Sequence, residues 1–132
     1  MSRLALIATV IFAAACAAPE AEPAEDTTET DSRLEGVWEY LPPTQGQSIA
    51  QDGRFVFLYG PADGSSPMTG ESGNYEISGD TVKNTIRFST NPDRIGVEYW
   101  WTIESISGDT LSFVTMNPEG EATGGGRSVR IR

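Results

Sequence analysis

The sequence predicts an all-β fold, a small antiparallel up-and-down barrel of about seven to eight strands. Three observations predict it. From residue 34 onward, apolar and polar residues alternate with the period of two that is typical of strands, and no window has a convincing helical period. Clusters of Gly, Pro, Asn and Asp separate the alternating segments. Two near-identical Gly-Asp turns, within residues 77–82 and 106–111, indicate hairpins between consecutive strands.

Length and composition exclude several classes of function. The chain has 132 residues, which leaves room for one domain with one core. Its formal net charge is −10, with no histidine and a single lysine, and this argues against nucleic acid as a partner. With no histidine and only one cysteine, no Cys/His or Ser/His pair exists, and zinc lacks its commonest ligands. We therefore expect a protein that is not an enzyme and needs no metal and no cofactor.

Residues 1–15 have the pattern of a signal peptide. Arg3 precedes an apolar run over residues 4–15 that ends in small residues. Pro19 and Glu20 follow before the run reaches the roughly 20 apolar residues that a membrane-spanning helix needs. The run is therefore expected to target the chain and not to span a membrane.

The end of this run, Ala13-Ala14-Ala15-Cys16, resembles the lipobox of bacterial lipoproteins, although that family usually has Leu at the position of Ala13. The resemblance implies that Cys16 is lipidated and anchors the protein to a membrane of the bacterial cell envelope. Ala17 in place of Asp implies the outer membrane, with the domain facing the periplasm or the surface. The alternative is ordinary cleavage after Ala15, which would release a soluble protein with a free thiol at Cys16.

Residues 16–33 are expected to be an acidic, Pro/Ala/Glu-rich disordered linker. The segment after Cys16 contains no large apolar residue, so it cannot bury enough surface to offset the entropy of ordering. At about 3.1 Å per residue it would reach up to about 50 Å. It is either a spacer that holds the domain off the membrane or a featureless connection whose exact sequence is immaterial.

The barrel domain is expected over residues 34–132, and its first strand carries Trp38 on the inward parity. Leu34, Gly36 and Tyr40 share that parity, whereas Glu35 and Glu39 lie on the other. Pro42 and Pro43 end the strand because neither can donate to a ladder. The polar stretch that follows has room for a turn of helix around residues 48–51.

The second strand is expected over residues 53–59. Phe55, Phe57 and Tyr59 lie on one face, and the other face is apolar too, with Val56 and Leu58. That second face is expected to be covered in part by a loop or by a partner. Residues 60–73 are expected to form a long Gly/Ser/Pro loop.

Two hairpins follow. In the first, a Gly79-Asp80 tip pairs Ser78 with Thr81 and Glu76 with Lys83 as an outward charge pair. The inward face of this hairpin then holds Tyr75, Ile77, Val82, Ile86 and Phe88. In the second hairpin, Ile103 and Ile106 share a face only if one residue bulges near residues 104–105, and we predict that bulge. The last strand is expected over residues 127–132, after the glycines at 124–126.

The order of these features resembles a bacterial lipocalin-like (calycin-type) domain. The matching residues are Leu34-x-Gly36-x-Trp38, Gly73-x-Tyr75-x-Ile77-x-Gly79-Asp80-Thr81-Val82, Ser89-x-Asn91-Pro92, Gly96, Tyr99 and Gly108-Asp109-Thr110-Leu111. The resemblance implies a structural floor of Gly36 and Trp38, with an arginine from near the last strand lying over the indole. Arg130 is the best candidate and Arg132 the next.

The chain departs from this family in its strand count, because seven strands are recognisable and a lipocalin barrel has eight. Three explanations stand open. The run from residue 95 to residue 106 bends and serves twice, a strand lies unrecognised within residues 42–52 or 60–72, or the barrel is incomplete. A flattened barrel filled by its own side chains would contain no cavity.

The predicted inner face suggests binding of a small apolar molecule, since such sites combine apolar walls with a few polar groups. The candidate ligand-lining residues are Phe55, Phe57, Tyr59, Tyr75, Asn84, Ile86, Phe88, Tyr99, Trp101 and Phe113. The alternative is a structural or protein-binding envelope lipoprotein with a filled barrel. In that case an envelope protein would bind an outer patch formed by Trp100 beside Val56 and Leu58.

Overall fold

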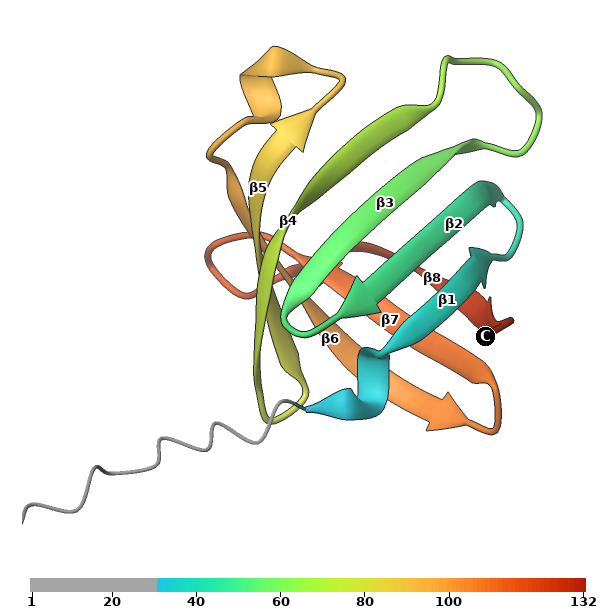
Figure 1. Cartoon of the computed structure of the whole chain (residues 1–132), viewed down its shortest axis with the longest axis vertical. Coiled ribbons are helices and arrows are strands. Elements are labelled where there is room, and N and C mark those ends of the chain that lie inside the picture. Colours follow the sequence, from blue (N-terminus) through green and yellow to red (C-terminus); the bar gives the residue numbers. More distant parts are fainter. Residues whose placement is uncertain (1–30) are drawn as a thin grey trace, which may run out of the picture.

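The computed structural model of the protein describes residues 31–132, which form a closed antiparallel barrel of eight strands (Figure 1). Each strand pairs with its neighbours in the sequence, and the first strand closes the barrel against the last. The predicted fold class is confirmed. The expected signal peptide, Cys16 and most of the expected linker lie outside the described residues. No helix within residues 31–132 is long and apolar enough to cross a membrane.

Eight strands and two short 3-10 helices make up the described chain. The strands are β1 (Gly36–Tyr40), β2 (Thr44–Gln51), β3 (Arg54–Pro61), β4 (Thr69–Ser78), β5 (Thr81–Ser89), β6 (Glu98–Ser107), β7 (Thr110–Met116) and β8 (Ala122–Arg130). The 3-10 helices are η1 (Ser32–Leu34), before β1, and η2 (Pro92–Arg94), between β5 and β6.

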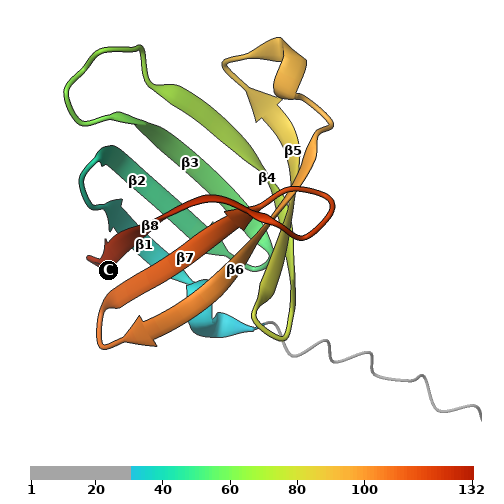
Figure 2. The same ribbon diagram turned by 180° about the vertical axis from the view of Figure 1, so that it is seen from behind.

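The barrel has two different ends (Figures 1 and 2). At the floor end lie η1 and the tight turns that follow β2, β4 and β6. At the open end lie the connections that follow β1, β3, β5 and β7, of which the connection after β5 carries η2. Because the strands alternate in direction, residues early in β1, β3, β5 and β7 lie near the floor, and residues late in them lie near the open end.

The eighth strand is β2, in the polar segment between Pro43 and Asp52, and residues 48–51 belong to this strand and form no turn of helix. The inward side chains of β2 are the small Ser48 and Ala50, so this strand lacks the bulky alternation that marks the others. The missed signal is the Asp52-Gly53 turn, where both residues have positive φ (48° and 71°). An Asp-Gly pair with this geometry matches the twist of a hairpin.

Both predicted hairpin features are confirmed. Ser78 pairs with Thr81 and Glu76 lies opposite Lys83, although the Nζ atom of Lys83 forms its ion pair with Glu98 of β6, at 2.9 Å. In the second hairpin the register shifts between Ile103 and Ser105, where the bulge was predicted.

The expected long loop over residues 60–73 is wrong, because β3 extends to Pro61 and β4 begins at Thr69. A second bulge follows from this pairing. The register of β4 with β5 shifts between Ser72 and Gly73, so that Gly73 lies opposite Ile86 and Ser72 opposite Phe88. The extra residue in β5 reverses the parity, and Phe88 points outward with 72% of its surface exposed.

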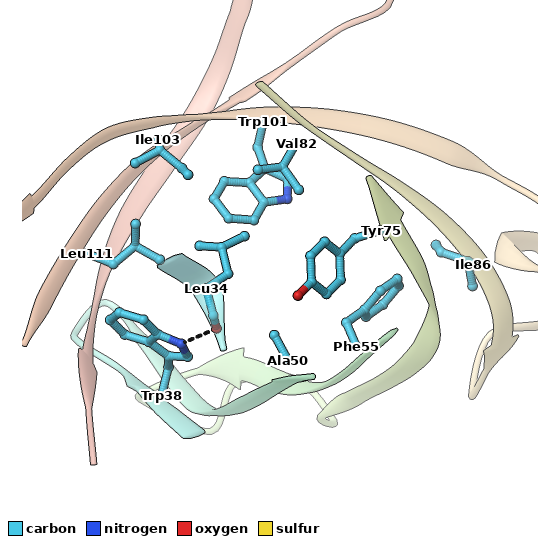
Figure 3. Close-up of a cluster of buried hydrophobic side chains, with 10 residues drawn as sticks. All are labelled: Leu34, Trp38, Ala50, Phe55, Tyr75, Val82, Ile86, Trp101, Ile103 and Leu111. Carbon is cyan, nitrogen blue, oxygen red and sulfur yellow. Dashed lines mark hydrogen bonds between the residues drawn. The ribbon is translucent and has the colours of Figure 1, made fainter. Parts of the chain in front are cut away.

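The floor is built as the resemblance implied. Trp38 is 2% exposed, and its indole Nε1 donates to the carbonyl oxygen of Leu34 at 2.8 Å (Figure 3). The guanidinium carbon of Arg130 lies 4.5 Å from the centroid of the Trp38 ring. The Nη2 atom of Arg130 donates to the carbonyl oxygen of Arg33 at 2.7 Å. The last residues of the expected linker, within η1, are therefore folded onto the barrel.

The apolar core surrounds the barrel axis and draws on η1 and on strands β1 to β7 (Figure 3). Its buried members are Leu34, Trp38, Ala50, Phe55, Tyr75, Val82, Ile86, Trp101, Ile103 and Leu111. Leu34 and Leu111 lie near Trp38, and Phe55 and Tyr75 lie together on the opposite side of the core (Figure 3).

Candidate binding cavity

A cavity of about 380 Å³ lies inside the barrel, so the interior is not filled by side chains. It extends from Leu34 and Trp38 at the floor to Arg94 at the open end. The predicted lining residues that the structure places on it are Phe55, Phe57, Tyr59, Tyr75, Asn84, Tyr99, Trp101 and Phe113. Ile86 is fully buried in the core but does not line the cavity. Phe88 lies outside the barrel because of the register shift between Ser72 and Gly73.

Aromatic side chains form much of the wall. The rings of Trp101 and Phe113 meet edge to face, with centroids 5.7 Å apart. The ring centroids of Phe55 and Phe57 on β3 lie 4.4 Å apart. The ring of Tyr40 meets those of Tyr59 and Phe113 edge to face, with centroids 6.5 Å apart in both cases. Edge-to-face contacts of this kind hold rings in defined orientations, so the wall presents a shaped apolar surface.

Asn84 is a deeply buried polar side chain of the wall, at 1% exposure. Its Oδ1 atom accepts a hydrogen bond from the indole Nε1 of Trp101 at 2.7 Å. An indole N–H only donates, so the side-chain oxygen must face it, and this settles which way the amide points. The remaining Nδ2 atom is buried and has no hydrogen-bond partner within the described part of the chain.

Tyr75 of β4 lies directly opposite Asn84 in the register. Its ring is buried, and its hydroxyl points toward the interior of the barrel (Figure 3). No residue from 31 to 132 forms a hydrogen bond with this hydroxyl. Burial raises the pKa of the phenol above its ordinary value, so the hydroxyl keeps its proton at neutral pH and remains able to donate.

An ion pair stands at the open end of the cavity, between a buried carboxylate and an arginine with 35% of its side chain exposed. Glu71 points inward from β4 with 1% of its side chain exposed, and Arg94 reaches it from η2. The Nε atom of Arg94 donates to Oε1 at 2.8 Å, and Nη2 donates to Oε2 at 3.4 Å. The guanidinium carbon also lies 5.5 Å from the centroid of the Tyr99 ring. Arg94 therefore neutralises the buried carboxylate of Glu71.

Local structure explains how Arg94 is positioned. Pro92 opens η2, and the side chain of Asn91 caps it by accepting from the backbone N–H of Asp93 at 3.1 Å. The backbone N–H of Gly96 then donates to the carbonyl oxygen of Ile86 at 2.8 Å, which returns the chain to the barrel. The sequence Asn-Pro-Asp-Arg thus folds a short loop that directs Arg94 over the open end.

The phenols around this pair are neutral. Burial raises the pKa of Tyr40 to about 12, and the negative charge of Glu71 adds to the effect. Burial likewise raises the pKa of Tyr99 and of Tyr59, with Glu71 again contributing. The cavity wall therefore carries hydroxyl groups and one neutralised ion pair.

Sequence reasoning missed Arg94 and Tyr40 as cavity residues, and it missed Glu71 as the buried partner of Arg94. A signal was present for Glu71, because it shares the parity of Tyr75 and Ile77 along β4. Tyr40 shares the parity of Trp38 in the same way. No periodic signal marks Arg94, which lies in a loop.

The outer face differs from the expected patch around Trp100. Val56 and Leu58 are exposed, but they lie on β3, and β4 and β5 separate them from Trp100 on β6, which is half-buried. The exposed apolar side chains instead form a row across β2 to β5, in which Ile49 lies opposite Val56, and Ser72 lies opposite both Val56 and Phe88. Trp100 is not part of this row.

The arrangement in the barrel has the properties of a binding site, with aromatic walls, buried hydrogen-bonding groups and a matched ion pair at one end. Within residues 31–132, no group of three or more His, Cys, Asp or Glu side chains is arranged to hold a metal ion. The chain matches no model of a known protein family, no curated protein and no solved structure.

Proposed function

We propose that the protein is a lipid-anchored protein of the bacterial cell envelope whose lipocalin-like barrel binds a small apolar molecule. The observation that carries this proposal is the cavity of about 380 Å³ with its aromatic wall. Pockets for small molecules generally span about 300–1,000 Å³ and combine apolar walls with a few placed polar groups. Asn84, Tyr75 and Arg94, whose charge is paired with Glu71, supply such groups here. We propose a binding role and not an enzymatic one.

The position of η1 supports an anchored arrangement. Arg33 forms ion pairs with Asp31 and with Asp80 of the β4–β5 turn, each at 2.7 Å, and these contacts hold the start of the described chain at the floor end. An anchor on Cys16 would therefore connect to the floor, opposite the end at which Arg94 lies.

Ligand binding is tested with the neutral fluorescent probe N-phenyl-1-naphthylamine. We expect saturable fluorescence enhancement with one site per chain. Ala50→Leu places three further carbon atoms in the cavity, and we expect it to weaken binding at least about tenfold, because overfilling a packed wall is unfavourable. The control is Ile49→Leu, on the adjacent outward position of β2. Absence of saturable binding, or equal affinity in Ala50→Leu and wild type, would contradict the proposal.

The anchor is tested by palmitate labelling of cells that express the wild type or Cys16→Ser. We expect label in the wild type alone, with the protein in the membrane fraction. Equal labelling of the two proteins would show that Cys16 is not the lipidation site.

A second candidate function, binding of an envelope protein, is favoured by the exposed row of Ile49, Val56 and Phe88. Ile49 and Val56 lie side by side, and Ser72 separates them from Phe88. Large exposed apolar patches often mark protein–protein contacts. Pull-down from an envelope extract with wild type and with a Val56→Thr/Phe88→Ser variant tests it. Recovery of the same proteins by both would count against this role.

A further inference from the structure

We propose that the ligand of the cavity is an uncharged molecule with an apolar body and one carbonyl-type acceptor oxygen, and that this oxygen accepts a hydrogen bond from Nδ2 of Asn84. The inference rests on the proposed function, because it names the class of molecule that the same cavity takes. Three features of the wall carry it.

The first feature is the orientation of the Asn84 amide. Trp101 holds Oδ1 at 2.7 Å, so Nδ2 is the atom left to interact with a cavity occupant. Asn84 is 1% exposed, and its Nδ2 is without a partner among residues 31–132. A buried donor in this state is unfavourable, and an acceptor oxygen on a ligand would satisfy it. A pure hydrocarbon would leave it unsatisfied.

The second feature is the chemistry next to Asn84 on the wall. Tyr75 and Tyr99 lie directly opposite Asn84 on the neighbouring strands. The Tyr75 hydroxyl is also buried and unpartnered within the described residues, and it is able to donate. A carbonyl oxygen has two lone pairs, so it suits a wall whose free polar groups are donors.

The third feature is charge. The carboxylate of Glu71 is already paired with Arg94, and both guanidinium nitrogens that face it are used. An anionic ligand would have to compete with Glu71 for Arg94 and would place a second negative charge nearby. A cationic ligand would meet Arg94. Arg94 keeps 35% of its side chain exposed, but deeper in the barrel, beside Asn84 at 1% exposure, a charged group would lose its hydration without gaining a partner. This leaves an uncharged molecule.

The test compares three two-ring probes that share one body: 2-acetylnaphthalene, a ketone; 2-ethylnaphthalene, a hydrocarbon; and 2-naphthoate, a carboxylate. Affinities for the full chain at neutral pH are measured by titration calorimetry. We expect the ketone to bind about tenfold more tightly than the hydrocarbon, as one satisfied buried hydrogen bond implies, and the carboxylate to bind most weakly.

Asn84→Leu tests the assigned residue. It removes the amide at similar size, and we expect the ratio of ketone to hydrocarbon affinity to fall to about one. Asn74→Leu makes the same change on the exposed outer face of β4, and it should leave the ratio unchanged. A general change in cavity shape alters the affinities of both probes, so it largely cancels in their ratio. An unchanged ratio in Asn84→Leu, or tightest binding of 2-naphthoate, would overturn the inference.

A measurement on the wild type keeps the inference testable if Asn84→Leu does not fold. The side-chain amide resonance of Asn84 should shift with 2-acetylnaphthalene and much less with 2-ethylnaphthalene. Equal shifts with both probes would overturn the inference. If the hydrocarbon binds and the ketone has no advantage, the ligand class is wrong but the binding function stands. If none of the three probes binds, the proposed function itself fails.

Discussion

Arg130 illustrates how one residue near the end of the chain stabilises the start of the barrel. Its guanidinium covers the indole of Trp38 on β1 and also donates to the backbone of Arg33 in η1. Trp38 in turn holds the carbonyl oxygen of Leu34. The floor is therefore a contact between the two termini of the described chain, and its loss should loosen both.

We predict that Arg130→Ala lowers the free energy of unfolding by about 2 kcal/mol, because it removes a cation–π contact and a hydrogen bond. Urea denaturation followed by tryptophan fluorescence measures the change. Arg54→Ala, which removes an exposed arginine of β3, is the matched control and should change the stability little. Equal stability of Arg130→Ala and wild type would show that the contact does not stabilise the floor.

Within a strand, a bulge decides whether the following side chains point into the barrel or away from it. Phe88 has the inward parity of Ile86 in the sequence, yet the register shift beside Gly73 turns it outward. In β6 the bulge between Ile103 and Ser105 has the opposite effect, because it keeps Ile103 and Ile106 on the inner side. The first bulge can be recognised only from the pairing of β5 with β4. The second was predicted from the sequence, because the apolar residues on its two sides would otherwise lie on opposite faces.

We predict that Phe88→Ala changes the free energy of unfolding by less than about 0.5 kcal/mol, since its side chain is mostly in water. Phe55→Ala, at 2% exposure on β3, should lower it by about 3–5 kcal/mol. Thermal or urea unfolding of both variants measures the difference. A large loss in Phe88→Ala would place this ring inside the barrel and contradict the register shift.

The β2–β3 pairing depends on a close approach at Gly46. Gly46 has a φ of +124°, and a Cβ atom there would clash with the backbone carbonyl oxygen of Leu58. We predict that Gly46→Ala lowers the free energy of unfolding by about 2 kcal/mol or more. Gly124→Ala on β8, where the nearest atom is the Thr115 hydroxyl and the φ is ordinary, should be clearly milder. If both variants are equally stable, the close approach at Gly46 is not required.

At the scale of the whole molecule, all four tyrosines of the chain are buried enough to have raised pKa values. Each phenol ionises near pH 10 in the unfolded chain and at higher pH in the barrel. Between these values the unfolded state binds fewer protons than the folded state, so stability falls as pH rises. The stabilisation from the protonated phenols is complete below about pH 10. It is lost as the pH rises through the pKa values of the phenols in the folded protein, and the pKa of Tyr40 is about 12.

We therefore predict that the folded protein shows less phenolate absorbance at 295 nm near pH 10.5 than the protein in urea, which titrates normally. The free energy of unfolding should decline from about pH 10 upward. Normal phenolate formation in the folded protein would mean that the tyrosines are not buried in the barrel.

The sequence by itself determined the strand class, the two Gly-Asp hairpins, the inward parity of Trp38 and its pairing with Arg130, and most of the aromatic part of the cavity wall. These properties follow from period-two alternation and from turn chemistry, which act over a few residues, or from the resemblance in the case of the floor. The alternation pattern did not predict β2 because its inward residues, Ser48 and Ala50, are small, although the Asp52-Gly53 turn indicated its hairpin.

The tertiary structure alone decided the outward position of Phe88, the Glu71–Arg94 pair, the amide orientation of Asn84 and the existence of a cavity. Each depends on which residues of different strands lie opposite one another. Glu71 becomes a buried charge only because a loop folded around Pro92 brings Arg94 to it, and Asn84 is left with an unpartnered donor only because Trp101 occupies its oxygen. Periodicity along one strand carries no information about such partners, because register and closure are properties of the whole barrel.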